Sequence, residues 1–243
     1  MKDYSYLSSG IIYLREIGGD APLIDVGNCS GLTLTPQEDS KSLADYRNPG
    51  GGTYNEVQRL TGVEMSYTFH DFSPANLARA LRGGAATVAG GTVSAEKHTV
   101  KRGGFVMLAK LPKSITSVSL TSGGAKQEGT DYEVRPGGLY IPATSSITDG
   151  AEISVNYTAA ASEKVQALVN SAKEYEMVFV GVNEARGGKQ TRIHAFRVSH
   201  GLLREFAAIG DEYGAGEVSG KLLADPSKTG VGQSKYFTVE IED

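Results

Sequence analysis

A strict alternation of apolar and polar residues marks the clearest strand of this sequence. Between Val63 and His70 every second residue is large and apolar and the residues between are polar, which is typical of a strand with one buried face. The C-terminal residues Phe237–Glu242 alternate in the same way. We therefore expect the chain to end inside a sheet.

Further apolar runs predict that almost the whole chain is β. A run from Tyr175 to Val182 and a second from Ile193 to Val198 flank a break at 185–190 and predict a long hairpin. The second half of the first run is apolar on both faces, so we expect both faces to be covered. Other strands are expected at Ile11–Arg15, Leu23–Val26, Leu32–Thr35, Val93–Val100, Phe105–Leu111 and Glu217–Leu223.

One segment carries the signals of an α-helix. Ser73 can cap the first free amides, Pro74 fits the first helical position, and Gly83 suits a left-handed C-terminal stop. The apolar stripe of this helix would be formed by Leu77, Ala78 and Leu81. The segment Ser162–Leu168 also permits a second short helix.

The segment Ser114–Tyr157 differs in texture from its surroundings. It consists of short alternating runs separated by turns at 122–124, 136–138 and 149–150. We expect a small all-β insert at 113–160, between two core segments at 1–112 and 161–243. Because about 45 residues is near the lower limit for an independent core, the insert is expected to lean on the main domain.

A polar, glycine-rich stretch from Pro36 to Tyr54 is expected to be a long loop. Such loops are uncommon in compact domains and usually contact something, and tyrosine and arginine are enriched at interface hot spots. The alternative is a mobile surface loop without a partner. The candidate interface residues are Asp45, Tyr46, Arg47, Asn48, Pro49, Gly50, Gly51, Gly52, Thr53 and Tyr54.

Composition and charge narrow the possible functions. The 243 residues contain 31 glycines and 8 prolines and carry a formal charge of −4. A negative chain is a poor general nucleic-acid binder, because such binders neutralise phosphates with clustered cations. The single cysteine, Cys29, rules out an intramolecular disulfide and is expected to be a small buried residue. No apolar run is long enough to span a bilayer, so no membrane insertion is expected.

The search for chemistry gives no catalytic, cofactor-binding or metal site. Gly216–Lys221 resembles a phosphate loop, but only three residues separate its glycines and Leu222 replaces the magnesium-binding hydroxyl. The histidines show no metal-ligand spacing, and those inside predicted strands are expected to face solvent, namely His70 and His194. The densest acidic cluster lacks a calcium-binding register and consists of Asp211, Glu212 and Glu217.

The order of these pieces carries a family resemblance. The strand VEMSYTFHDF at 63–72 runs directly into the capped helix, and FAAIGDEYG at 206–214 is followed by EVSGKLLAD at 217–225. Together they resemble the major tail (tail tube) proteins of long-tailed, siphovirus-like bacteriophages, over residues 18–243. Within the insert, GTDYEV at 129–134 and DGAEISVNY at 149–157 are similar to small β modules of phage tail proteins.

The resemblance implies a mainly β fold, a β-sandwich or barrel with one flanking helix and a small immunoglobulin-like insert. It implies a virion protein, assembled in the host bacterial cytoplasm, whose rings of six copies stack into a hollow tube that passes double-stranded DNA. Its partners would be identical subunits and the tail terminator, tape measure and baseplate proteins. The family has no catalytic residues or cofactor to carry over. The segment Ser40–Tyr54 would be disordered in the monomer and docked in the tube.

Two other classes of protein remain open. A type VI secretion tube protein shares the architecture, although such proteins are usually compact single domains. A β-rich adhesion or carbohydrate-binding module would suit the tyrosines and glycine turns equally well, but it would not polymerise.

Overall fold

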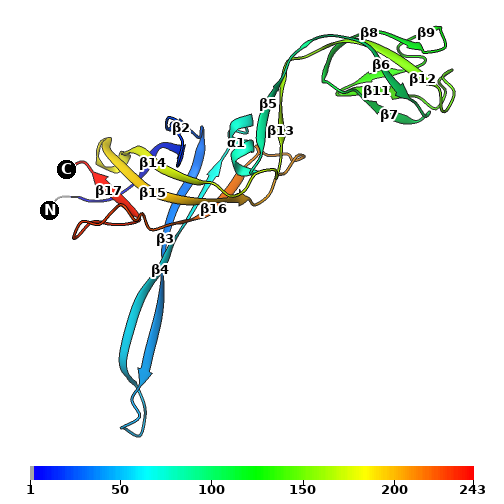
Figure 1. Cartoon of the computed structure of the whole chain (residues 1–243). Helices are drawn as coiled ribbons and strands as arrows, with labels where there is room; N and C mark the ends of the chain where they lie inside the picture. The colour runs from blue at the N-terminus through cyan, green and yellow to red at the C-terminus, as the bar shows by residue number, and fades with distance from the viewer. Residues whose placement is uncertain (1–2) are drawn as a thin grey trace. The chain divides into compact units, whose positions relative to one another are not determined.

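The computed structural model describes residues 3–243, which form two compact units (Figure 1). The larger unit comprises the chain up to Gly84 together with Gln166–Asp243, and the smaller unit is Ala85–Val165. Most residues lie in antiparallel sheets, which confirms the predicted mainly β class. Among residues 3–243, no helix has the length and hydropathy needed to cross a bilayer.

The larger unit is built on one antiparallel sheet with the strand order β2-β1-β14-β15-β16-β4-β3, and β17 pairs with β15. The predicted long hairpin is formed by β14 and β15 around a 3-10 turn, η1 (Glu184–Arg186). The predicted C-terminal strand is also confirmed. The strands are β1 (Ser8–Glu16), β2 (Ile24–Asp25), β3 (Cys29–Ala44), β4 (Thr53–Phe69), β14 (Glu174–Asn183), β15 (Lys189–Leu203), β16 (Gly216–Leu222) and β17 (Phe237–Ile241).

The core of the larger unit takes side chains from both halves of this sheet. Ile12 and Leu14 of β1 belong to the same buried cluster as Val218 of β16, so the sheet curves around one core in a β-sandwich-like arrangement. Every apolar residue of the predicted alternation is buried in this cluster, namely Val63, Met65, Tyr67 and Phe69. The period-two pattern thus marked the buried face correctly.

The predicted helix is α1 (Pro74–Ala80), with Ser73 as its cap. The Ser73 hydroxyl accepts a hydrogen bond of 3.3 Å from the amide of Asn76. The expected apolar stripe of Leu77, Ala78 and Leu81 is only partly right: Leu81 packs against the core, but the fully buried helix residues are Asn76 and Ala80. Asn76 tolerates burial because its side-chain amide donates to the carbonyls of Val26 and Asp71, both at 2.7 Å.

The helix ends differently from the prediction. The left-handed residue after α1 is Arg82, with φ of 46°, and Gly83 does not have a positive φ. Gly83 is required for another reason, since a Cβ there would lie 2.3 Å from the carbonyl oxygen of Gln166. The glycine therefore permits a close backbone contact rather than a turn.

The smaller unit contains two antiparallel sheets, β10-β11-β7 and β6-β12-β8-β9. Its own buried cluster includes Leu139, Ile153 and Tyr157, so this unit has an independent core. Its strands are β6 (Gly91–Thr99), β7 (Gly104–Met107), β8 (Pro112–Leu120), β9 (Ala125–Lys126), β10 (Glu133–Arg135), β11 (Gly138–Ile141) and β12 (Glu152–Ala159).

The smaller unit is longer than the expected insert at 113–160. Strands β6 and β7, assigned to the first core segment 1–112, pair with β12 and β11 and belong to the smaller unit. A two-stranded ribbon of β5 (Gly84–Val88) and β13 (Ser162–Gln166) leads into and out of it. The helix considered at Ser162–Leu168 is therefore wrong, because pairing with β5 makes this segment a strand.

Candidate self-assembly surface

The hairpin of β3 and β4 changes character along its length. Near the sheet, Leu34 of β3 pairs with Met65 of β4, and Met65 is buried in the core. Both strands then continue beyond the rest of the sheet as a two-stranded ribbon (Figure 1). We call residues 38–61, the part of this hairpin beyond the core, the distal arm.

The distal arm has no core on either face. Of its 24 residues, only Asp45 is partly covered and the rest are exposed. Its exposed large hydrophobic side chains are Leu43 (52%), Tyr46 (87%), Tyr54 (62%), Val57 (45%) and Leu60 (50%). In the observed register, Leu43 and Val57 fall on one face and Leu60 on the other. Apolar side chains thus meet solvent on both sides of the ribbon.

The tip of the arm is a turn held by its own polar groups. Asp45 accepts hydrogen bonds from the amide of Arg47 at 2.8 Å and from the side chain of Asn48 at 2.6 Å. The amide of Asp45 also donates to the carbonyl of Gly52 at 2.8 Å. The Arg47 and Asn48 bonds hold the pKa of the Asp45 carboxyl below its usual range.

The expectation of a long loop at Pro36–Tyr54 is wrong for most of its length. β3 continues to Ala44 and β4 begins at Thr53, so only residues 45–52 lie outside the ladder. The segment Ser40–Tyr54 is likewise an ordered hairpin rather than a disordered one. The reason is physical: a strand ladder uses backbone groups, so a polar sequence without apolar alternation can still pair.

A second exposed apolar area lies on the outer face of the same unit. Ile11 of β1 pairs with Val180 of β14, and these side chains are 41% and 42% exposed. Val182 is 38% exposed. The expectation that both faces of this part of β14 are covered is therefore wrong within the described chain. We call Ile11, Val180 and Val182 the outer apolar patch.

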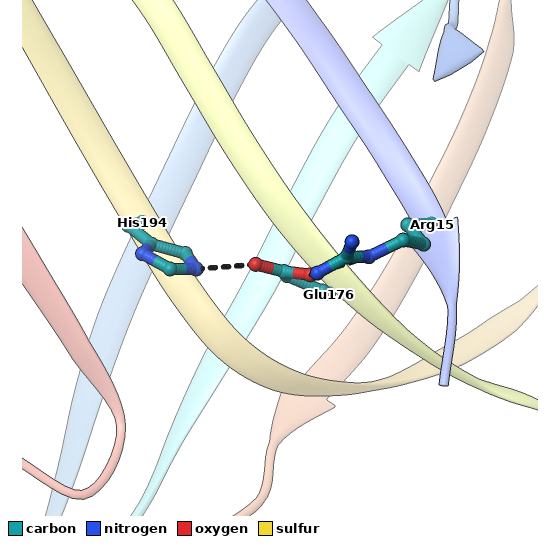
Figure 2. A network of polar contacts seen from close by, with 3 residues as sticks. All are labelled: Arg15, Glu176 and His194. Carbon is teal, nitrogen blue, oxygen red and sulfur yellow. Dashed lines mark hydrogen bonds and ion pairs between the residues drawn. The ribbon is translucent and has the colours of Figure 1, made fainter. Parts of the chain in front are cut away.

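A polar network joins three strands on the same face of the sheet as this patch. Glu176 of β14 accepts a hydrogen bond from Arg15 Nε at 2.8 Å and contacts His194 Nε2 at 2.7 Å (Figure 2). One carboxylate therefore joins β1, β14 and β15, and its side chain is only 16% exposed. Such a bridge stabilises neighbouring strands and fixes their register.

The four histidines all have polar partners. His70 contacts the Ser30 hydroxyl at 2.6 Å and the Gly214 carbonyl at 3.1 Å, so it is half-buried rather than simply solvent-facing. The other three contact acidic or phenolic groups, namely Glu96 for His98, Glu176 for His194 and Tyr67 for His200. No group of three or more metal-ligating side chains occurs within residues 3–243.

The other residues considered as candidate sites from the sequence lie in ordinary structural positions. Gly216–Lys221 lies in β16, so it is a strand and not a phosphate loop. Cys29 is half-buried rather than fully buried, and burial raises the pKa of its thiol to about 11, which keeps it protonated at neutral pH. Of the acidic cluster, Glu217 forms an ion pair with Arg204 at 3.0 Å.

The fold and its exposed hairpin define a β-rich protein with a projecting arm. Over residues 5–240 the chain matches the family described as Protein of unknown function UCP028589, and it belongs to that family. A comparison with curated proteins found no match. The matched region contains the complete smaller unit, nearly all of the larger unit and the complete distal arm.

Proposed function

We propose that this chain is a structural subunit that assembles with copies of itself into the stacked rings of a phage-type tail tube. The observation that carries the proposal is the distal arm, a two-stranded ribbon with exposed apolar side chains on both faces. An isolated two-stranded hairpin is marginally stable in water. A neighbouring copy that covers the arm would bury these apolar side chains and stabilise the hairpin.

Free strand edges support lateral assembly. Among the described strands, β3 pairs only with β4, and β17 pairs only with β15. Exposed edges recruit other strands unless something covers them, and a closed ring of identical subunits covers them by symmetry. The outer apolar patch provides further area that an adjacent subunit can bury.

The arm supports stacking of rings. From Glu38 to Ala44 the strand extends by about 20 Å at the usual rise per residue, which is enough to reach into an adjacent ring. Contact between rings joins two different surfaces, and repetition of such a contact produces a filament. The arm would therefore form the contact between stacked rings, whereas the strand edges would form the contacts between subunits of one ring.

The net charge agrees with passage of DNA through such a tube. Six copies at −4 each sum to −24 per ring. A lumen poor in cations would not gain the counterion release that drives phosphate binding. We therefore expect Ser, Thr, Asp and Glu to outnumber Lys and Arg on lumen-facing strand positions, and a continuous arginine-lined channel would contradict this.

Negative-stain electron microscopy of the purified full chain tests the proposal. We expect rings or tubes whose end views average to six-fold symmetry, and a sedimentation coefficient that rises with protein concentration. Discrete small particles at all concentrations would contradict self-assembly and favour an adhesion or carbohydrate-binding module. A type VI secretion tube would also polymerise, but the second unit with its own core favours the phage tail, because secretion tube proteins are usually single domains.

A further inference from the structure

A small cavity of the larger unit is lined by cationic side chains. Its volume is about 190 Å³, and it lies among α1, the segment 170–173 and the strands β14 and β15. Arg79, Arg82 and Lys173 all line it, together with His200. Within the described chain, no aspartate or glutamate is part of this lining. A surplus of positive charge faces a space that no described side chain fills.

The backbone fixes Arg82 at this cavity in an unusual conformation. Its φ of 46° lies in the left-handed region, which costs free energy for a residue with a Cβ. The conformation is held because the amides of Val169 and Asn170 both donate to the Arg82 carbonyl, at 3.1 and 2.9 Å. The amide of Gly83 also donates to Ala78 at 2.6 Å. Hydrogen bonds at the Arg82 carbonyl and at the following amide therefore fix the backbone from which the Arg82 side chain extends.

One donor of the Arg82 side chain is unsatisfied within the part of the chain that the structure describes. The Arg82 Nε is buried, and no hydrogen-bond acceptor for it occurs within residues 3–243. A buried donor of a charged group without an acceptor is destabilising. An anion in the cavity would satisfy this donor and balance the charge.

The other cations leave the local charge positive. Lys173 forms an ion pair with Glu16 at 2.8 Å, and both side chains are nearly half exposed. Arg79 donates to the neutral side chain of Asn76, so this bond does not cancel its charge. Burial, followed by the nearby charge of Arg79, lowers the pKa of His200 to about 4, and Arg82 acts in the same direction. The positive charges at the cavity therefore disfavour protonation of the buried His200.

We propose that this cavity binds a single oxyanion group, a phosphate or a carboxylate, with Arg82 and Arg79 as its principal donors. Guanidinium groups suit these anions because their planar N–H donors match the oxygen geometry. The volume of about 190 Å³ is below the range of about 300–1,000 Å³ typical of pockets for larger ligands, so it suits one small group. The oxyanion could come from a free anion or from an acidic side chain of a second copy. This inference does not depend on the proposed tube.

Titration of inorganic phosphate, and separately of acetate, into the dilute full chain tests the proposal by calorimetry at constant ionic strength. We expect saturable binding of at least one anion and an affinity about tenfold lower for Arg82→Gln, because a charge-assisted hydrogen bond is lost. The matched control is Arg192→Gln, which removes one exposed guanidinium of the same unit that does not line the cavity, and it should bind like the wild type.

Absence of saturable binding of both anions, or equal weakening by Arg82→Gln and Arg192→Gln, would overturn the proposal. If Arg82→Gln loses its native circular dichroism, Lys173→Gln replaces it, since Lys173 is exposed and its loss should weaken binding several-fold without unfolding. Sedimentation equilibrium then identifies the source of the anion. Self-association that decreases with added phosphate assigns a carboxylate of a second copy, and unchanged self-association assigns a free anion.

Discussion

Tyr67 and His200 share a buried hydrogen bond of 2.7 Å between the phenol oxygen and Nε2. His200 Nδ1 lies 2.9 Å from the Gly201 carbonyl, which can only accept, so Nδ1 carries the proton. Nε2 is then the acceptor and the Tyr67 hydroxyl donates to it. This assignment holds for the neutral imidazole, and burial is the main reason that the pKa of His200 is lowered to about 4, which keeps the ring neutral at pH 7.

This pair predicts that the larger unit becomes less stable as the pH falls from 7 to 5. In the unfolded chain His200 has an ordinary pKa of about 6.5 and takes up a proton in this range, whereas in the folded state it does not. The free energy of unfolding should therefore fall by about 2 kcal/mol between pH 7 and pH 5. Native-state hydrogen exchange of core amides in the larger unit measures this loss.

Two histidine variants isolate the contribution of His200. His200→Gln should lack most of this loss between pH 7 and pH 5. His194→Gln, which changes a histidine of the same strand, should retain it. Equal pH dependence in the wild type and His200→Gln would show that other groups cause the effect.

The backbones of β1 and β14 lie so close together at Gly181 that adding one methyl group there should lower the stability of the chain. Gly10 and Gly181 are paired across these strands, and a Cβ on Gly181 would lie 2.4 Å from the Ser9 carbonyl oxygen. Gly181→Ala should therefore destabilise the chain by about 1–3 kcal/mol, because strand backbones cannot yield without breaking their ladder. Urea denaturation followed by circular dichroism gives this value.

The control for this variant is a strand glycine without close neighbours. A Cβ on Gly62 of β4 would meet nothing within 4 Å, and its φ is not positive. Gly62→Ala should leave the stability unchanged or raise it by about 0.5–1 kcal/mol. A loss of stability as large as that of Gly181→Ala would contradict the steric explanation.

The Glu176 bridge predicts a moderate, salt-dependent effect. Glu176→Gln removes the negative charge that Arg15 and His194 share, and we expect a loss of about 1 kcal/mol at low salt. The loss should shrink in 1 M salt, because Arg15 is 45% exposed and its charge is screened. Urea denaturation at both salt concentrations measures it. Glu205→Gln, at an exposed residue of the same unit, should have no effect, and a similar loss there would contradict a specific bridge.

The alternation of apolar and polar residues predicted the strands that bury one face. The run from Val63 to Phe69 and the hairpin of β14 and β15 were recoverable because burial imposes period two on the sequence. The distal arm was not recoverable in this way, since it buries neither face and its ladder leaves no apolar pattern. Ser162–Gln166 was ambiguous for a related reason, because only its pairing with β5 makes it a strand.

The cavity could not be predicted, because its cations come from distant parts of the chain. Arg79 lies in the last turn of α1 and Arg82 just after it, whereas Lys173 precedes β14, and only the fold brings them together. The buried His200 did leave a signal that was missed. It lies two residues after the buried Val198 on β15, and therefore on the same face of the strand.

The distal arm predicts separate effects of mutation on assembly and on stability. Leu43→Ser changes a side chain that is 52% exposed in the isolated chain, so the melting temperature of dilute protein should hardly change. Assembly into rings and tubes should require a several-fold higher concentration, because apolar area buried by a neighbour is lost. The control is Met107→Ser, which removes a 73% exposed apolar side chain from the smaller unit and should assemble normally. Equal assembly of all three proteins would exclude the arm as an interface.

The independent core of the smaller unit predicts that this unit can be separated from the rest. Its buried cluster is complete within Ala85–Val165, so this fragment should fold alone with a cooperative melt in circular dichroism. The complementary protein, with a short Gly-Ser linker between Gly84 and Gln166, should retain the larger core. Under the tube hypothesis it should also retain assembly, because the arm and the free edges all lie in the larger unit. If this protein folds but never forms rings in the electron microscope, the smaller unit is part of the subunit interface, and the arm and edges are not sufficient.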